Sequence, residues 1–233
     1  MTVAGTDTMP SWLLLQLADS AFPAGGFAHS AGLEAAMQMG EAKGAEGTRA
    51  FLEQALWQAG YGALPFVRAV HERAAHENAG AMGELDAHCH AFLTSEVANR
   101  ASRTAGRALL ATCAEVFDSP EIAALDTAVR RRELHAHQAP VIGAVTRALG
   151  IDCEPAQRLT LHLTLRGVAS AAVRLGMIGP HEAQRIQHRM AGVMDRVLAT
   201  CGALPVDEAA QPAPLLDLFG SLHGRLYARL FLS

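Results

Sequence analysis

The chain has 233 residues, of which 50% are apolar and 18% are charged, and its formal net charge at pH 7 is −4. A chain of this length buries roughly 70 to 75% of its unfolded surface, and this apolar content is typical of a globular protein with a filled core, which excludes a disordered chain. Acidic and basic residues are interleaved, so the sequence lacks the large basic field that nucleic-acid binding requires.

The sequence also predicts a protein that does not cross a membrane. Its longest segments without a charged residue, Ser20 to Leu33 and Gln54 to Val67, have 14 residues each, whereas a helical span needs roughly 18 to 20. No basic segment precedes an apolar run near residue 1, so neither a signal peptide nor a transit peptide is expected. The four cysteines are too far apart for a CxxC unit. They indicate small core residues in a reducing compartment, which predicts a cytoplasmic protein.

Apolar residues recur at helical spacing through most of the chain, which predicts an all-α fold. The first helix is expected from Trp12 to Ala18, with Ser11 as its cap, and it should end before Pro23. Thr48 is a candidate cap for a later helix. The next three helices are expected at about residues 29–39, 48–59 and 64–76.

The middle of the chain contains two apolar stripes, within residues 85–93 and 105–116, that predict a pair of packed helices. Ser119 followed by Pro120 is a helix-start signature, and Pro140 is expected to open the next helix, which Gly150 closes. The segment 159–165 alternates apolar and polar residues, as a strand would. Because the apolar pattern continues to Leu175, a helix is favoured there.

The last third of the chain begins with a helix that Gly179 and Pro180 start. Residues 204–214 contain three prolines and predict a linker. We therefore expect a single-domain helical bundle of roughly eight to ten helices over residues 1–233. Within it, residues 1–10 should be flexible, residues 204–214 should form a Pro-rich linker, and residues 215–233 should form a docking segment.

The expected docking segment carries an apolar stripe that no later element follows to cover. We therefore expect this stripe to need a partner protein. Its members recur at helical spacing and are Leu215, Leu218, Phe219, Leu222, Leu226 and Leu230.

The eleven histidines raise the question of a metal site. His88 and His90 diverge by about 200° on a helix, so they do not converge on one ion. His135 and His137 precede Pro140, where an extended chain would place both side chains on one face, a spacing compatible with a weak site. Ordinary surface or core histidines are the favoured interpretation, and no metal ligand is assigned.

The sequence offers little support for catalysis. It contains no GxSxG elbow, and the carboxylates fall on apparently solvated helix faces. Lys43 is the only lysine and lies outside any GxxxxGK[ST] segment, which excludes a P-loop nucleotide site. We therefore expect a protein that is not an enzyme and that holds no tightly bound cofactor.

Five ordered segments of the chain resemble the urease accessory protein UreF family. The first is SAFPAGGFAHSAGLE, from Ser20 to Glu34. The other four are Ser102 to Leu110, His137 to Ile151, Ala171 to Gln184 and Pro214 to Ser233.

The resemblance implies an all-helical homodimer that binds the accessory protein UreD, also called UreH, and recruits the GTPase UreG. The assembly would mature apo-urease by inserting nickel, with GTP bound by the partner GTPase and nickel handled by the complex. Two alternatives remain open from the residues alone, a stand-alone metal-binding regulator and a helical hydrolase.

The resemblance also implies where partners bind. In the N-terminal motif the candidates, which turn geometry alone would also explain, are Pro23, Gly25, Gly26, His29, Ser30 and Glu34. Three arginines would bind partner carboxylates or brace buried helix ends: Arg103, Arg107 and Arg174. The docking candidates near the end of the chain are Leu222, Arg225, Leu226, Arg229 and Phe231.

Overall fold

The computed structural model describes residues 8–25, 29–73, 80–222 and 230–231. Over these residues the chain is helical and contains no β-strand, which confirms the predicted all-α single domain. None of the helices within these ranges combines the length and the apolar character that a membrane crossing demands. The first half of the chain forms α1 (Thr8–Ala18), α2 (Leu33–Gln38), α3 (Gly44–Gly62), α4 (Leu64–Arg73), α5 (Gly80–Phe92) and α6 (Glu96–Val116).

The second half of the chain is also helical. It forms α7 (Pro120–Arg130), α8 (Gln138–Ala148), α9 (Cys153–Arg174), α10 (Pro180–Cys201), a short 3₁₀ turn (Val206–Glu208) and α11 (Pro214–Leu222). The alternating segment 159–165 lies within α9, so the helical interpretation is confirmed.

Local sequence signals set several helix ends as expected. Ser119 caps α7, because its hydroxyl oxygen accepts the backbone N–H of Ile122 at 3.4 Å and Pro120 occupies the first turn. Gly150 follows α8 with a φ of 71°, the left-handed conformation that ends many helices. Pro180 opens α10 after Gly179.

Three of the predicted helix starts are wrong. Helix α1 already begins at Thr8, so Ser11 lies inside it. Helix α3 begins at Gly44, and the Thr48 hydroxyl donates to the Gly44 carbonyl oxygen at 2.7 Å, a bond within the helix and not a cap. Helix α8 begins two residues before Pro140.

The predicted helix at 29–39 is also shorter than expected. Ala31 and Gly32 have φ values of 53° and 87°, which a right-handed helix excludes, so α2 begins only at Leu33.

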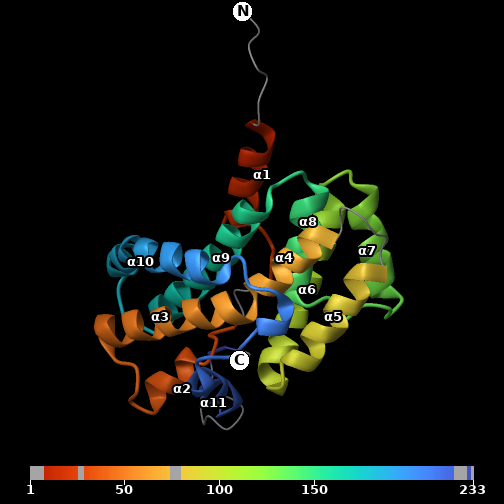
Figure 1. Ribbon diagram of the computed structural model, residues 1–233. Helices are drawn as coiled ribbons and strands as arrows, with labels where there is room; N and C mark the ends of the chain where they lie inside the picture. Colours follow the sequence, from red (N-terminus) through yellow and green to blue (C-terminus); the bar gives the residue numbers. More distant parts are fainter. Residues whose placement is uncertain (1–7, 26–28, 74–79, 223–229, 232–233) are drawn as a thin grey trace, which may run out of the picture.

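The core consists of two apolar clusters that share α4 and α9. The first cluster includes buried residues of α5, α6, α7 and α8, and the second includes buried residues of α2, α3 and α10. In Figure 1 these groups lie on opposite sides of the molecule, with α4 and α9 between them. Leu159 of α9 belongs to the first cluster and Leu161 to the second, so this helix contributes to both.

Helices α2 and α11 pack against each other at one end of the molecule, and α1 projects at the other end, where it contacts α9 (Figure 1). The expected linker is bound along the body of the protein. Ala210 N–H donates to the Tyr61 carbonyl oxygen at 3.2 Å, and Ala213 N–H donates to Gln58 Oε1 at 2.9 Å. These bonds hold the segment between α10 and α11 against α3.

Candidate partner-binding site

The N-terminal motif begins with a turn that is fastened to α6. The Pro23 carbonyl oxygen accepts a hydrogen bond from the Thr112 hydroxyl at 3.0 Å. Gly25 has a φ of 70°, and a Cβ atom there would lie 2.8 Å from the Cβ of Ala108. Both the backbone conformation and the close approach therefore require glycine. This geometry favours turn geometry over direct partner contact for Pro23 and Gly25.

The motif then passes under α11. Gly32 has a φ of 87°, and a Cβ atom there would lie 2.9 Å from the backbone nitrogen of Gly220 and 3.1 Å from the carbonyl oxygen of Leu216. Ser30 is buried, and its carbonyl oxygen accepts the N–H of Leu33 at 3.1 Å. The motif therefore forms a surface on which α11 packs.

Glu34 is the buried carboxylate at this end of the protein, with only 2% of the residue exposed. Its two oxygens accept the backbone N–H groups of Leu230 at 2.7 Å and Phe231 at 3.2 Å. Arg174, the last residue of α9, lies over the Phe231 ring, with 4.1 Å between the guanidinium carbon and the ring centroid. Burial lowers the pKa of this guanidinium. Residues far apart in sequence thus meet at one place.

The residues 214–222 and 230–231, called here the tail segment, divide into an inner and an outer set. Leu216, Phe219 and Phe231 pack against the second core cluster. Of these, only Phe219 belongs to the stripe that was expected to stay uncovered, so that expectation is wrong for Phe219, which packs near Gly32. The large apolar side chains that stay exposed are Leu215 (62%), Leu218 (49%) and Leu230 (59%).

Of five more expected site residues, the structure describes one. Leu222 ends α11 and is half-buried. Gly26, Arg225, Leu226 and Arg229 lie outside the described residues.

Arg103 and Arg107 lie on α6, and both contact the protein itself. Arg103 Nε donates to Asn99 Oδ1 at 2.9 Å, and Arg107 Nε donates to the carbonyl oxygen of His135 at 3.2 Å. Each Nε donor is thus used within the chain, as the bracing role requires, and the four Nη hydrogens of each guanidinium leave the binding of partner carboxylates open as the alternative.

The loop between α7 and α8 carries a histidine cluster that the sequence revealed only in part. His90 of α5 stacks on His135 with ring centroids 3.9 Å apart, and His90 Nδ1 lies 3.1 Å from His137 Nε2. Asp86, also on α5, accepts the backbone N–H groups of His135 at 2.6 Å and His137 at 2.8 Å. The sequence spacing indicated that His135 and His137 could share a face. It did not indicate His90, because α5 reaches these two residues only through helix packing.

The arrangement of the histidine cluster bears on two kinds of chemistry, metal binding and hydrolysis. No group of three or more histidine, cysteine or acidic side chains with a metal-binding arrangement occurs in the part of the chain that the structure describes. Burial lowers the pKa of His137 to about 4, while Asp86 raises it and His90, His135 and Arg103 lower it further. His137 Nδ1 lies 3.1 Å from the Ser102 hydroxyl. Since an effective general base has a pKa near the working pH, this pair is poorly suited to hydrolysis.

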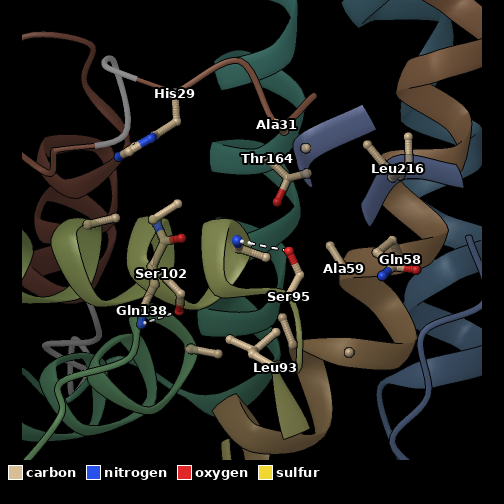
Figure 2. A pocket seen from close by; sticks show the side chains of 18 of the residues that line it. His29, Ala31, Gln58, Ala59, Leu93, Ser95, Ser102, Gln138, Thr164 and Leu216 are labelled. Atoms are coloured by element: carbon tan, nitrogen blue, oxygen red, sulfur yellow. Dashed lines mark hydrogen bonds between the residues drawn. The ribbon is translucent and has the colours of Figure 1, made fainter. Parts of the chain in front are cut away.

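A cavity of about 340 Å³ lies between α3, α6, α9 and α11. Figure 2 shows Gln58 of α3, Thr164 of α9 and Leu216 of α11 around it, with Ser102 next to Gln138. Most of the surface is apolar. His29, Ala31 and Gly32 also line this cavity, so the N-terminal motif forms part of its wall.

Comparison with known proteins shows to which family this chain is similar. The sequence profile of the UreF family matches residues 42–191. The urease accessory protein F of Oryza sativa subsp. indica is 39% identical over 224 residues, covering 94% of this chain and 84% of the relative. The protein of the same name from Arabidopsis thaliana is 38% identical over 224 residues, covering 95% and 92%.

A bacterial relative extends the match. The urease accessory protein UreF of Trichodesmium erythraeum (strain IMS101) is 28% identical over 228 residues, which cover 97% of this chain and 98% of the relative. The profile match covers more than half of the chain, and the plant relatives are more than 30% identical over nearly all of it. The chain therefore belongs to the UreF family of urease accessory proteins.

Proposed function

We propose that this protein is a scaffold for urease maturation that links UreD/UreH to the GTPase UreG and thereby supports nickel insertion into apo-urease. The observation that carries this proposal is the exposed apolar surface of the tail segment, formed by Leu215, Leu218 and Leu230. The family supports the role in urease maturation, and this surface supports docking through the tail.

The exposed leucines suit a protein interface for an energetic reason. Burying a leucine side chain that was in water contributes roughly 1.5 to 3 kcal/mol. Leu215 and Leu218 lie on a helix whose other side is packed on the core through Leu216 and Phe219. A helix that is already held in place loses little further conformational freedom on binding. In this proposal UreD/UreH docks on this surface.

The proposal assigns the nucleotide and the metal to other proteins. GTP is bound by the partner GTPase, nickel is handled by the assembled complex, and this chain acts without a catalytic residue or a tightly bound cofactor of its own. The protein works as a homodimer in the cytosol. All four cysteines are free thiols, which a reducing compartment favours.

Co-purification with UreD/UreH and UreG from the same source tests the proposal. The double variant Leu215→Ser/Leu218→Ser should weaken capture of UreD/UreH by at least about tenfold, because it removes apolar area from the interface. The matched control is Val116→Ser, which changes an apolar residue of similar exposure (49%) at the end of α6. If the double variant binds UreD/UreH as the control does, docking through the tail segment is wrong.

Two further measurements separate the alternatives. Size measurement of the purified protein should give a dimer, and a monomer at micromolar concentration contradicts the homodimer. Titration with Ni²⁺ in a calorimeter should show no stoichiometric submicromolar site, and such a site would favour a stand-alone metal-binding regulator.

A further inference from the structure

We propose that Glu34 and Arg174 are positioning residues that fix the register of the tail segment, so that Phe231 is held inside and Leu230 is presented outside. This inference rests on the proposed function, because it concerns how the docking surface is held. In this proposal the N-terminal motif binds the other end of the same chain and holds it in one alignment.

The first argument is the way in which Glu34 bonds. Its carboxylate accepts two consecutive backbone N–H groups, from Leu230 and Phe231, and each oxygen takes one of them. A carboxylate buried to 2% exposure depends on such charge-assisted bonds, because leaving it without donors is energetically expensive. Since backbone amides are bound, the contact fixes the path of the chain independently of the side chains there.

The second argument is the difference between the two neighbours that Glu34 holds. Phe231 is 6% exposed and packs in the second core cluster, whereas Leu230 is 59% exposed. A slip of one residue would carry Leu230 into the buried position and present another side chain to solvent. The two hydrogen bonds oppose this slip, so the carboxylate determines which side chain the surface offers.

The third argument is the selection of an aromatic ring. Arg174 lies over the ring of Phe231, and a guanidinium over an aromatic face is attracted by its quadrupole. A leucine offers no such face. Arg174 therefore discriminates between Phe231 and Leu230 for the inner position, and it acts together with Glu34, which aligns the backbone.

The fourth argument is that the same motif holds the other part of the tail segment. Gly32, two residues before Glu34, lies against the backbone of Gly220 in α11. The exposed Leu215 and Leu218 on α11 and the exposed Leu230 are thus all placed by one short stretch around α2. Because the same stretch binds both parts of the tail segment, it can keep the three leucines in a fixed arrangement.

Hydrogen exchange of the purified full chain tests the positioning role without any partner. Glu34→Gln keeps the length of the side chain but puts an amide NH₂ where one of the two acceptors was. The peptide that carries Leu230 and Phe231 should then exchange at least about tenfold faster. Glu41→Gln is the matched control, because Glu41 is an exposed carboxylate of the same region and makes neither bond.

A second pair of variants addresses the ring contact. Arg174→Met keeps an apolar stem but removes the cation and should speed the exchange of the same peptide severalfold. Arg174→Lys keeps a cation near the ring and should restore part of the protection. If Arg174 acted only by filling space, the lysine variant would not exchange more slowly than the methionine variant.

Binding of UreD/UreH to the same variants connects the positioning role to function. Glu34→Gln should weaken capture several-fold while the far-UV circular dichroism spectrum stays that of the wild type. Unchanged exchange at the Leu230–Phe231 peptide in Glu34→Gln overturns the proposal, and so does acceleration that is spread equally over α3 and α10. If exchange changes as expected but neither Glu34→Gln nor Leu215→Ser/Leu218→Ser affects capture, the positioning role stands and the proposed docking function is the part that fails.

Discussion

Gly106 marks the closest approach of α6 to the backbone ahead of α8. A Cβ atom at this position would lie 2.1 Å from the carbonyl oxygen of Ala136 and 2.8 Å from the carbonyl carbon of His137. These neighbours are backbone atoms, which cannot move aside as the end of a side chain does. The loop that carries His135 and His137 can therefore meet α6 only because residue 106 has no side chain.

Gly106→Ala should destabilise the protein by about 3 kcal/mol or prevent folding, because the extra methyl group forces the loop away from α6. The measurement is the free energy of unfolding in urea. The matched control is Gly192→Ala in the exposed interior of α10, where a Cβ atom would meet only Arg196 Nη1 at 3.9 Å. That variant should gain roughly 0.5 to 1 kcal/mol from reduced backbone entropy. Equal effects of the two substitutions would contradict the steric account.

His137 makes the stability of the protein depend on pH. Burial lowers its pKa to about 4 in the folded protein, whereas an unfolded chain titrates near the ordinary value of 6.5. Between these two values the unfolded chain binds more protons, so the free energy of unfolding falls as the pH drops from about 6.5 towards 4. The charged and titratable groups around the ring are Asp86, His90, His135 and Arg103.

His137→Asn should remove this contribution, which reaches at most about 1.4 kcal/mol per pH unit. Asparagine is a suitable replacement because residue 137 is the N-cap of α8. Urea unfolding at several pH values between about 5 and 6.5 measures the slope. His181→Asn, at an exposed histidine of α10, should keep the wild-type slope. A wild-type slope in His137→Asn would show that other groups cause the pH dependence.

Helix α11 is stabilised chiefly by the helices on which it packs, α2 and α6. It is nine residues long, and isolated helices of this length are marginal in water. Its contacts with α2 and α6, together with the backbone approach at Gly32, supply the stability that the short helix lacks.

Gly32→Ala should loosen α11, because a methyl group there meets the backbone nitrogen of Gly220 at 2.9 Å. The amides of residues 214–222 should exchange at least about tenfold faster, since local opening becomes easier. Gly176→Ala is the control. Gly176 also has a positive φ, 69°, but a Cβ atom there would meet nothing within 4 Å. If both variants speed exchange in α11 alike, backbone strain and not the contact with α11 is the cause.

At the scale of the whole molecule, α4 and α9 connect the two core clusters. Phe66 of α4 is in the first cluster and Leu64 in the second, and α9 is divided in the same way. Because neither cluster has its own complete set of helices, we expect the two to unfold together.

Leu110→Ala in the first cluster tests this cooperativity. Leu110 is fully buried in α6, and its truncation should lower the free energy of unfolding by about 2 to 5 kcal/mol. The fluorescence of Trp57, which packs against the second cluster, should report the same loss in a Trp12→Phe background. Independent clusters would leave the Trp57 transition where it is in the background protein while circular dichroism shifts.

Much of the fold follows from local signals that act within a few residues. The apolar periodicity of α10, the cap at Ser119 and the proline at position 180 each depend on short-range geometry, and the structure confirms the helices that they predict. The errors at Thr48 and Ser11 have the same origin, because a threonine or serine one turn inside a helix looks like a cap when only neighbours in sequence are considered.

The candidate site was predicted less completely, and the reason lies in distance along the chain. The family motifs identified Glu34, Arg174 and Phe231 as relevant, but the contacts of Glu34 with residues 230 and 231 join positions nearly 200 apart in sequence. No periodicity or spacing reports such a contact. The same holds for His90, which the packing of α5 brings to His135 and His137.

The all-α class, the positions of most helices and the family resemblance could be predicted from the amino-acid sequence, since these properties depend on local preferences and on ordered motifs. Which apolar residues of the tail segment are covered and which remain exposed depends on packing between distant parts of the chain. At Leu230 and Phe231 the contacts come from two other helices, through the carboxylate of Glu34 in α2 and the guanidinium of Arg174 in α9. Side chains from separate elements acquire a common role only when packing brings them into contact.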